Sequence, residues 1–98
     1  MSLSKRCYEL LHQIPRGKVT TYKVLADTLG TKGYRAIGQI LKRNPNPIIC
    51  PCHRVVSSDG KIGGFALGAA KKIELLEGEG VKIKNNQTID LKASLFNF

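Results

Sequence analysis

Apolar residues near the start of the chain recur every three or four positions, which is the spacing of one side of an α-helix. This stripe consists of Leu3, Cys7, Leu10, Leu11 and Ile14. Pro15 and Gly17 end the pattern, because proline interrupts a helix and glycine favours a turn. We therefore predict a first amphipathic helix in which Cys7 is a small buried hydrophobic residue.

Two further helical patterns lie close together. Thr20 or Thr21 can cap the first of them, and Gly30 can end it in the left-handed conformation. The second runs from about residue 34 to 43 and has an apolar side formed by Ile37, Ile40 and Leu41. A short glycine-containing turn separates the two patterns, so residues 20–43 are predicted to form a helix-turn-helix.

The opposite side of the predicted third helix combines small, polar and cationic residues. It consists of Arg35, Ala36, Gly38, Gln39, Lys42 and Arg43. Small residues would let the backbone approach a nucleic-acid groove while the cations meet phosphates. A solvated helix weakened by a glycine is the alternative interpretation of the same pattern.

The second half of the chain predicts a connecting segment over residues 44–68, a helix over about 67–78 and a terminal hairpin over 81–91, followed by a tail. Residues 44–68 are called the active-site segment below, because they include the candidate chemistry described there. Within the segment, 48–50 and 54–56 resemble short extended pieces, and residues 57–60 can turn the chain into a small hairpin with 61–63. The fold class expected for residues 1–98 is mainly α with short β-hairpins, in a winged helix-turn-helix-like single domain.

Charge narrows the class of partner. The chain has 98 residues, with 16 Lys and Arg against 7 Asp and Glu and a formal net charge of +9. An anionic partner is expected, and nucleic acid is favoured over a membrane surface because the cations are scattered along the chain. No apolar stretch approaches the roughly 20 residues of a membrane span, so a cytoplasmic protein with three reduced cysteines is expected.

The sequence Cys50-Pro51-Cys52-His53 carries the candidate chemistry. Zinc is not expected, because no second Cys/His pair has finger-like spacing. Cys52 could instead be a nucleophile if His53 and Glu79 form a relay that removes its proton. Neighbouring side chains of an extended segment point apart, so this relay needs a turn or a bridging water. A buried structural cysteine is the competing interpretation.

Four motifs give the chain a resemblance to the C-terminal domain of the O6-alkylguanine-DNA alkyltransferases, the methylated-DNA–protein-cysteine methyltransferases. They are Gly-Lys-Val-Thr-Thr-Tyr at 17–22, Arg-Ala-Ile-Gly at 35–38, Asn-Pro at 44–45 and Pro-Cys-His-Arg-Val-Val at 51–56. The resemblance covers roughly residues 3 to 91. It implies repair of O6-alkylguanine in duplex DNA by nucleotide flipping and a single alkyl transfer to a cysteine. No cofactor or metal is implied, and a monomer that binds the minor groove is expected, in the cytoplasm near the nucleoid or in a eukaryotic nucleus.

The resemblance also implies the role of each matching catalytic residue. Cys52 corresponds to the alkyl acceptor, His53 to the water-bridged base and Glu79 to the carboxylate that orients it. Tyr22 corresponds to the tyrosine that helps turn the nucleotide and donates to the guanine. Asn44 corresponds to an asparagine that ties the recognition helix to the active-site segment.

Further matches concern the DNA and the base pocket. Arg35 corresponds to the arginine that enters the base stack in place of the flipped nucleotide. The carbonyls of Cys52 and Val55 would accept from the guanine amino group, and the N–H of Ala66 would reach its O6 side. Lys72 corresponds to a helix lysine near the pocket. Phe65 and Ala66 depart from the family pattern, since many members have Tyr-Ser there.

The resemblance leaves two functions open. No counterpart of the N-terminal domain of full-length members is expected, as in the short alkyltransferase-like proteins that bind alkylated DNA without repairing it. Those proteins often carry tryptophan at the cysteine position, whereas this chain has Cys52. A non-enzymatic lesion-binding protein that recruits other repair factors is therefore the alternative to the alkyltransferase. An ordinary helix-turn-helix regulator would need a dimer and major-groove readers, for which the sequence offers no sign.

Overall fold

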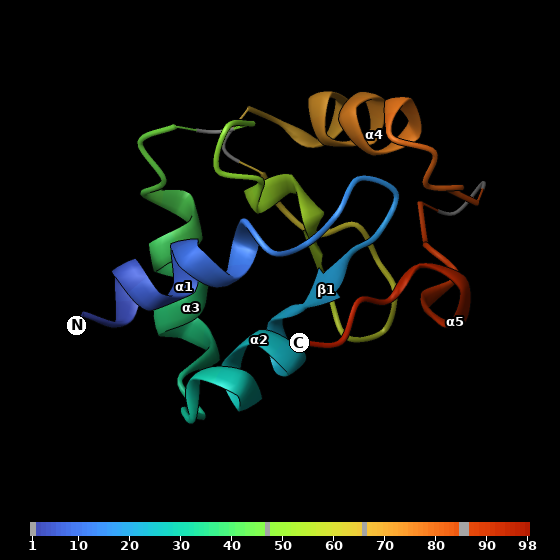
Figure 1. Cartoon of the computed structure of the whole chain (residues 1–98). Helices are drawn as coiled ribbons and strands as arrows, with labels where there is room; N and C mark the ends of the chain where they lie inside the picture. The colour runs from blue at the N-terminus through green and yellow to red at the C-terminus, as the bar shows by residue number, and fades with distance from the viewer. Residues whose placement is uncertain (1, 47, 66, 85–86) are drawn as a thin grey trace.

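The helices and strands of the computed structural model follow one another in an order that brings two distant segments together (Figure 1). The structure describes residues 2–46, 48–65, 67–84 and 87–98. Its elements are α1 (Leu3–Leu11), β1 (Thr20–Thr21), α2 (Tyr22–Leu29), α3 (Tyr34–Lys42), the 3-10 helix η1 (Cys52–Arg54), β2 (Val55–Val56), α4 (Ala69–Gly78) and α5 (Leu91–Ser94).

The three N-terminal helices confirm the predicted periodicity, although α1 ends at Leu11 rather than near Ile14, and α2 confirms the cap and the end that were predicted for it. The Ser2 Oγ accepts a hydrogen bond from the Lys5 N–H at 3.2 Å at the start of α1. The Thr21 Oγ1 accepts from the Val24 N–H at 3.1 Å, and Gly30 ends α2 with a φ of 73°. Because each cap satisfies backbone groups that the helix leaves free, these residues fix where the helices begin and end.

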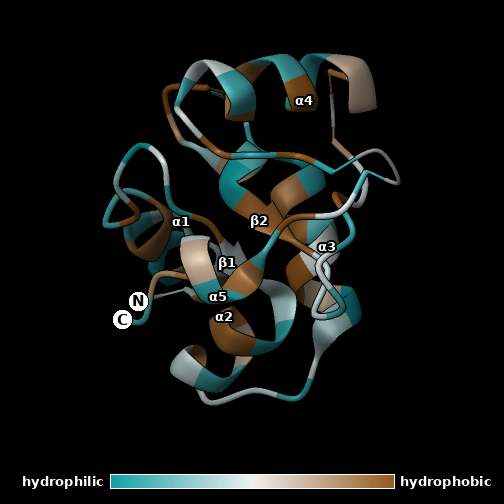
Figure 2. Ribbon diagram, turned by 90° about the vertical axis from the view of Figure 1, so that its right-hand side faces the viewer, coloured by the Kyte–Doolittle hydropathy of each residue, from teal (hydrophilic) through white to brown (hydrophobic). Residues whose placement is uncertain are grey.

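The apolar sides of α1, α2 and α3 meet in one core cluster, to which the active-site segment contributes. Its buried members are Cys7, Leu11, Ile14, Leu25, Ala26, Leu29, Ile37, Leu41, Cys50, Cys52 and Val55. Figure 2 shows hydrophobic residues gathered around β2 and on the neighbouring parts of α2 and α3. Cys7 is fully buried, as predicted. The candidate nucleophile therefore lies at the edge of the same core that holds the helix-turn-helix.

The strand pairing differs from the expected hairpin around residues 57–60. Val55 and Val56 are extended, as predicted, but they pair in parallel with Thr20 and Thr21 rather than with residues 61–63. The turn itself is present, since the Ser57 N–H donates to the Lys61 carbonyl at 2.9 Å. A parallel partner is remote along the chain and leaves no local turn signal, so the sequence pattern could not reveal it. This pairing joins the start of α2 to the end of η1.

The extended piece predicted for residues 48–50 is present only at Cys50, which takes part in a β-bridge. Ile48 and Ile49 lie in a turn, and Ile48 has a φ of 79°. The turn comes after α3 and the sequence Asn-Pro-Asn-Pro, whose prolines disfavour a continued helix.

The C-terminal part packs around a second, smaller cluster. Its buried residues are Val19, Val56, Leu76, Val81 and Ile89. α4 begins slightly later than predicted, after Gly68, whose φ is 94°. The terminal hairpin is represented by an antiparallel bridge between Ile83 and Ile89. The expected tail is wrong, because Asp90 caps a short helix, α5, and Leu95 bridges to Val19. In the described part of the chain, no helix combines the length and apolarity needed to cross a membrane.

Candidate active site

Cys52 is the first residue of η1 and is held there by backbone and side-chain hydrogen bonds. Its N–H donates to the Cys50 carbonyl at 2.8 Å. The same carbonyl accepts from the Asn44 Nδ2 at 2.8 Å, and the Asn44 Oδ1 accepts from the Asn46 N–H at 3.0 Å. Asn44 is buried just beyond the end of α3. The third helix and the active-site segment are therefore joined directly through one amide side chain.

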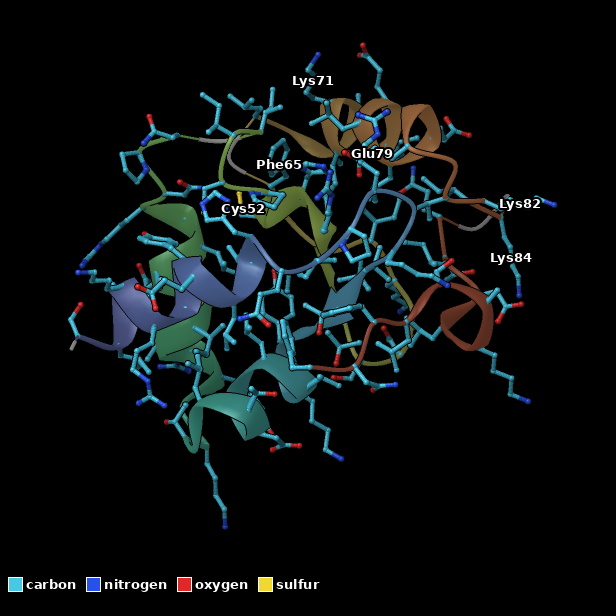
Figure 3. The ribbon with its side chains drawn as sticks, viewed as in Figure 1. Cys52, Phe65, Lys71, Glu79, Lys82 and Lys84 are labelled. Carbon is cyan, nitrogen blue, oxygen red and sulfur yellow. The ribbon has the colours of Figure 1, made fainter. Side chains whose placement is uncertain are left out.

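Cys52 borders a pocket of about 380 Å³ between the helix-turn-helix and the loop before α4. The lining residues are Tyr22, Gly38, Leu41, Lys42, Cys52, Gly64 and Phe65. Figure 3 shows Cys52 and Phe65 close together, with Glu79 to one side of them next to α4. Sequence reasoning missed Leu41 and Gly64, since a core leucine and a loop glycine carry no chemical signal. Ala66 lies outside the described residues.

The other two cysteines differ from Cys52 in their surroundings. Cys7 and Cys50 are both buried and neither borders the pocket. Burial, with a smaller contribution from a neighbouring thiol, raises the pKa of Cys7 to about 12 and that of Cys50 to about 11. Both therefore remain protonated thiols at neutral pH, and Cys52 is the cysteine that a pocket ligand could meet.

The geometric obstacle at His53 is resolved by η1. Because residues 52–54 form a helical turn rather than an extended segment, the His53 side chain is turned into the protein, where it is fully buried. Its Nε2 lies 3.0 Å from the Glu79 Oε2. The Phe65 ring meets the imidazole edge-on, with centroids 6.2 Å apart. The Nδ1 is buried and has no hydrogen-bond partner among the described residues.

These contacts define the protonation state of His53. Burial lowers the pKa of His53 below its usual value, although the hydrogen bond and charge of Glu79 oppose the shift. At neutral pH the imidazole is therefore uncharged, and its single proton sits on Nε2 because the Glu79 carboxylate can only accept. The Nδ1 consequently keeps a lone pair. Its free lone pair can accept a proton from a nearby thiol, directly or through water.

Glu79 caps the C-terminus of α4, where a carboxylate would be unfavourable without a partner. The carboxylate has two partners, Arg54 and His53. Arg54 donates from its Nε to the Glu79 Oε1 at 2.9 Å and from its Nη2 to the Glu79 Oε2 at 2.7 Å. Burial raises the pKa of Glu79, but the hydrogen bonds and charges of Arg54 and His53 outweigh it, so the pKa lies below its ordinary value. Glu79 is therefore a carboxylate. Sequence reasoning assigned no role to Arg54, although its place directly after His53 could have signalled one.

Lys72 is the other charged group of the interior, and its side chain is completely buried. Its Nζ donates to the Val55 carbonyl at 2.7 Å and to the Gly64 carbonyl at 3.1 Å. Burial lowers the pKa of Lys72 to about 8, against a smaller opposing effect of Cys52. Lys72 and Val55 do not line the pocket but fix the segments that do. The Val55 carbonyl retains one lone pair for a second donor.

The predicted outer face of α3 is at the surface. Arg35, Ala36, Gln39, Lys42 and Arg43 are exposed. Among the described residues, no hydrogen bond or ion pair holds any of these polar and cationic side chains. Gly38 and Lys42 belong to this face and also line the pocket. The outer face of α3 is therefore continuous with the wall of the Cys52 pocket.

Tyr22 lies at the other edge of this pocket, at the first position of α2. Burial, followed by the charge of Cys52, raises the pKa of Tyr22. Its hydroxyl therefore stays protonated at neutral pH and can donate to a pocket ligand.

The fold and the site together define a class: a helix-turn-helix domain whose second helix borders a pocketed cysteine backed by a histidine and a carboxylate. Residues 2–81 match the family model described as 6-O-methylguanine DNA methyltransferase, DNA binding domain. The chain belongs to this family.

Two curated relatives are longer than this chain. A methylated-DNA–protein-cysteine methyltransferase of Pyrobaculum aerophilum is 51% identical over 78 residues, which cover 80% of this chain and 51% of the relative. A bifunctional methyltransferase/endonuclease of Picrophilus torridus is 50% identical over 91 residues, which cover 92% of this chain and 30% of the relative. The chain thus spans about half, or less, of the length of these relatives.

Solved structures of two kinds resemble the fold. The Mycobacterium tuberculosis OGT in complex with DNA matches with a TM-score of 0.77 and 38% identity, over 82% of this chain and 49% of that one. The S. pombe Atl1 in complex with damaged DNA containing O6-carboxymethylguanine matches with a TM-score of 0.84 and 28% identity, over the full length of both chains. The helix-turn-helix fold expected from the sequence is confirmed.

Proposed function

We propose that this chain repairs DNA by transferring the alkyl group of an O6-alkylguanine directly to Cys52, one lesion per molecule. The observation that carries the proposal is the place of Cys52 at a pocket of about 380 Å³, with the neighbouring His53 paired to Glu79 at 3.0 Å. The family and the names of its relatives support the same reaction.

The proposed transfer is a single displacement. The Nδ1 of His53 takes the Cys52 proton through a bridging water, and Glu79 stabilises the imidazolium that forms. The thiolate sulfur attacks the alkyl carbon, so that a C–S bond forms while the C–O6 bond breaks. The electron pair of the broken bond stays on the guanine, which recovers a proton by way of solvent. The sulfur keeps the alkyl group, so the reaction occurs once and needs no cofactor.

The base must leave the duplex before the sulfur can reach it. We assign α3 to the minor groove, where its small residues Ala36 and Gly38 allow close approach and sequence readout is weak. Arg35 would fill the space of the flipped nucleotide. The Tyr22 hydroxyl would donate to the guanine. The exposed residues Gln39, Lys42 and Arg43 would contact the DNA backbone.

The pocket can hold a flipped base. Its volume of about 380 Å³ lies within the usual range for small-ligand sites. Phe65 would pack on the guanine ring, while the carbonyls of Cys52 and Val55 accept from its amino group. The Ala66 N–H is assigned to the O6 side. Lys72 would hold the Val55 carbonyl and the Gly64 loop in position for these contacts.

Lesion binding without transfer is the second candidate. The observation that favours it is the full-length match to S. pombe Atl1, which was solved with damaged DNA. Such a protein would recognise the lesion in the same pocket and leave the alkyl group on the base. The two candidates share every binding residue and differ only in whether Cys52 reacts.

Mass spectrometry of the intact protein separates the candidates. The protein is incubated with excess duplex containing one O6-methylguanine, and its mass is compared with that of the Cys52→Ala variant under the same conditions. The alkyltransferase gains the mass of one CH₂ group and Cys52→Ala gains nothing. Tight lesion binding with an unchanged mass would instead establish the lesion-binding function.

A further inference from the structure

Arg54 makes three side-chain hydrogen bonds that span separate parts of the fold. Its Nε and Nη2 form a fork on the Glu79 carboxylate at 2.9 and 2.7 Å, and its Nη1 donates to the Ile14 carbonyl at 2.7 Å. The side chains of Arg54 and Glu79 are 13% and 9% exposed. A planar guanidinium on a carboxylate is a rigid and strong pair, and here its third bond fixes the guanidinium as well.

The Glu79 Oε2 is shared between this fork and His53. It accepts from Arg54 at 2.7 Å while lying 3.0 Å from the His53 Nε2. An unpaired carboxylate beside an imidazole favours the doubly protonated, cationic form of the ring. An imidazolium has no lone pair, so it could not accept the proton of Cys52. A histidine that acts as a base next to a carboxylate therefore needs a group that offsets the negative charge, so that the imidazole stays neutral.

We propose that Arg54 is a positioning residue that offsets the charge of Glu79, so that His53 stays neutral and its Nδ1 remains free to accept a proton. The effect of Arg54 on catalysis rests on the proposed alkyl transfer. Its effect on the protonation of His53 does not. Glu79 then orients His53 through Nε2 without converting it to a cation before the reaction.

The groups that surround His53 fit this balance. The negative group is Glu79, at the end of α4. The positive groups are Arg54, which is on the same turn as His53, and Lys72, which is on α4. Cys52 is the neighbouring thiol. The carboxylate favours protonation of the imidazole, whereas burial and both cations disfavour it. Arg54 is the cation that is bonded to the carboxylate itself, so its removal should change the balance most.

A purely structural strut is the competing role for Arg54, because its bond to Ile14 ties η1 to the loop after α1. Both roles predict that Arg54→Met lowers stability. They differ in what happens to the protonation of His53 in the folded protein, which a strut has no reason to control.

An NMR titration of the histidine rings distinguishes the two roles. The chain has two histidines, and the exposed His12 serves as an internal reference. In the wild type, His53 should titrate below the usual histidine range. In folded Arg54→Met or Arg54→Gln, its midpoint should rise by about one pH unit, as expected when an ion pair no longer neutralises a nearby carboxylate. Arg54→Lys, which keeps the charge, should stay near the wild type.

Arg16→Met is the matched control, because Arg16 is exposed and, within the described ranges, its side chain bonds the Gly78 carbonyl alone, from Nη2 at 3.4 Å. It should change neither midpoint. An unchanged or lowered His53 midpoint in a folded neutral variant would overturn the proposal. So would a wild-type His53 that is cationic at neutral pH, and this measurement does not depend on whether a variant folds.

The pH profile of alkyl transfer provides the functional readout. Arg54→Met should transfer methyl more slowly than the wild type at pH values below its raised His53 midpoint and recover as the pH rises, since the imidazolium then loses its extra proton. Arg54→Lys should follow the wild-type profile, whereas a uniform loss at every pH would indicate a strut. If the wild type transfers nothing at all, the proposed function fails, while the titration still decides the role of Arg54.

Discussion

On the inner side of the Cys52 pocket, charged side chains from η1 and α4 bind one another away from solvent, whereas on the outer side the charged residues of α3 face solvent. Glu79 joins His53 and Arg54, and the buried Lys72 is bonded to two carbonyls. Among the described residues, Arg35 and Lys42 make no such side-chain bonds. The charged side chains of the inner side have bonding partners before any ligand arrives, whereas those of the outer side can gain partners from a ligand.

This contrast suits the proposed combination of alkyl transfer and DNA binding in one small domain. Groups that hold a proton in place must be preorganised, because reorganisation during the reaction raises the barrier. Groups that contact an extended anion gain by remaining solvated and free until they meet phosphates. Variants on the inner side should therefore affect stability and transfer, and those on the outer side should affect binding while stability is retained.

The largest effect is expected for Glu79→Gln on the inner side. The change leaves the Arg54 guanidinium without its anion, so the free energy of unfolding should fall by about 3 kcal/mol at pH 7. Urea denaturation at several pH values checks this. The pKa of Glu79 is lowered in the fold, so its contribution is full above the ordinary glutamate pKa and is lost as the pH falls through the lowered value. A variant as stable as the wild type at pH 7 would contradict the preorganised network.

Arg35→Ala is the corresponding change on the outer side. Its free energy of unfolding should stay within about 0.5 kcal/mol of the wild type, because Arg35 is exposed. Binding to a lesion-containing duplex should weaken by about 2 kcal/mol, because the stacking proposed for Arg35 among the bases would be lost. Fluorescence anisotropy with lesion and undamaged duplexes measures this, and repair should suffer more than binding to undamaged DNA.

Lys82→Ala is the matched control for Arg35→Ala. Figure 3 shows Lys82 pointing to solvent well away from Cys52 and Phe65. Its removal should leave the preference for lesion DNA unchanged. Equal losses of repair, lesion binding and binding to undamaged DNA in Arg35→Ala would count against insertion of Arg35 into the base stack.

For Gly38→Ala, where the inner and outer sides of the pocket meet, we expect smaller effects of opposite sign on stability and on lesion binding. A Cβ at this position would have nothing within 4 Å, and alanine favours a helix, so stability should rise by up to about 1 kcal/mol. The same methyl group would narrow the pocket and the approach to a groove, so lesion binding should weaken. Parallel denaturation and anisotropy measurements test both signs. Unchanged binding would place the DNA away from this face of α3.

Local sequence signals predicted one part of the molecule and missed another for a physical reason. The spacing of apolar residues, Thr21 and Gly30 determine helices through contacts within a few positions, and these helices were predicted. The parallel pairing of Thr20 with Val55 and the fork between Arg54 and Glu79 join residues far apart in sequence. Such contacts depend on the finished fold, so no local pattern contains them.

The candidate site shows the same division. The motif around Cys52 and its resemblance to a family drew attention to Cys52, His53 and Glu79, and the structure brings these three residues together. The sequence pattern predicts an extended segment at this place, on which the side chains of Cys52 and His53 would point apart. The structure has the helical turn η1 instead. The burial of Lys72 was also hidden, since a lysine in a helix is usually solvated.

The most direct test of alkyl transfer to Cys52 is to locate the transferred group within the protein. After reaction with an O6-methylguanine duplex, the peptide that contains Cys50 and Cys52 is fragmented in a mass spectrometer so that the two residues are resolved. Direct alkyl transfer predicts one methyl group on the Cys52 sulfur and none on Cys50 or Cys7, whose raised pKa values keep them protonated. Methylation of Cys50, or bound lesion with an unmodified Cys52, would contradict it.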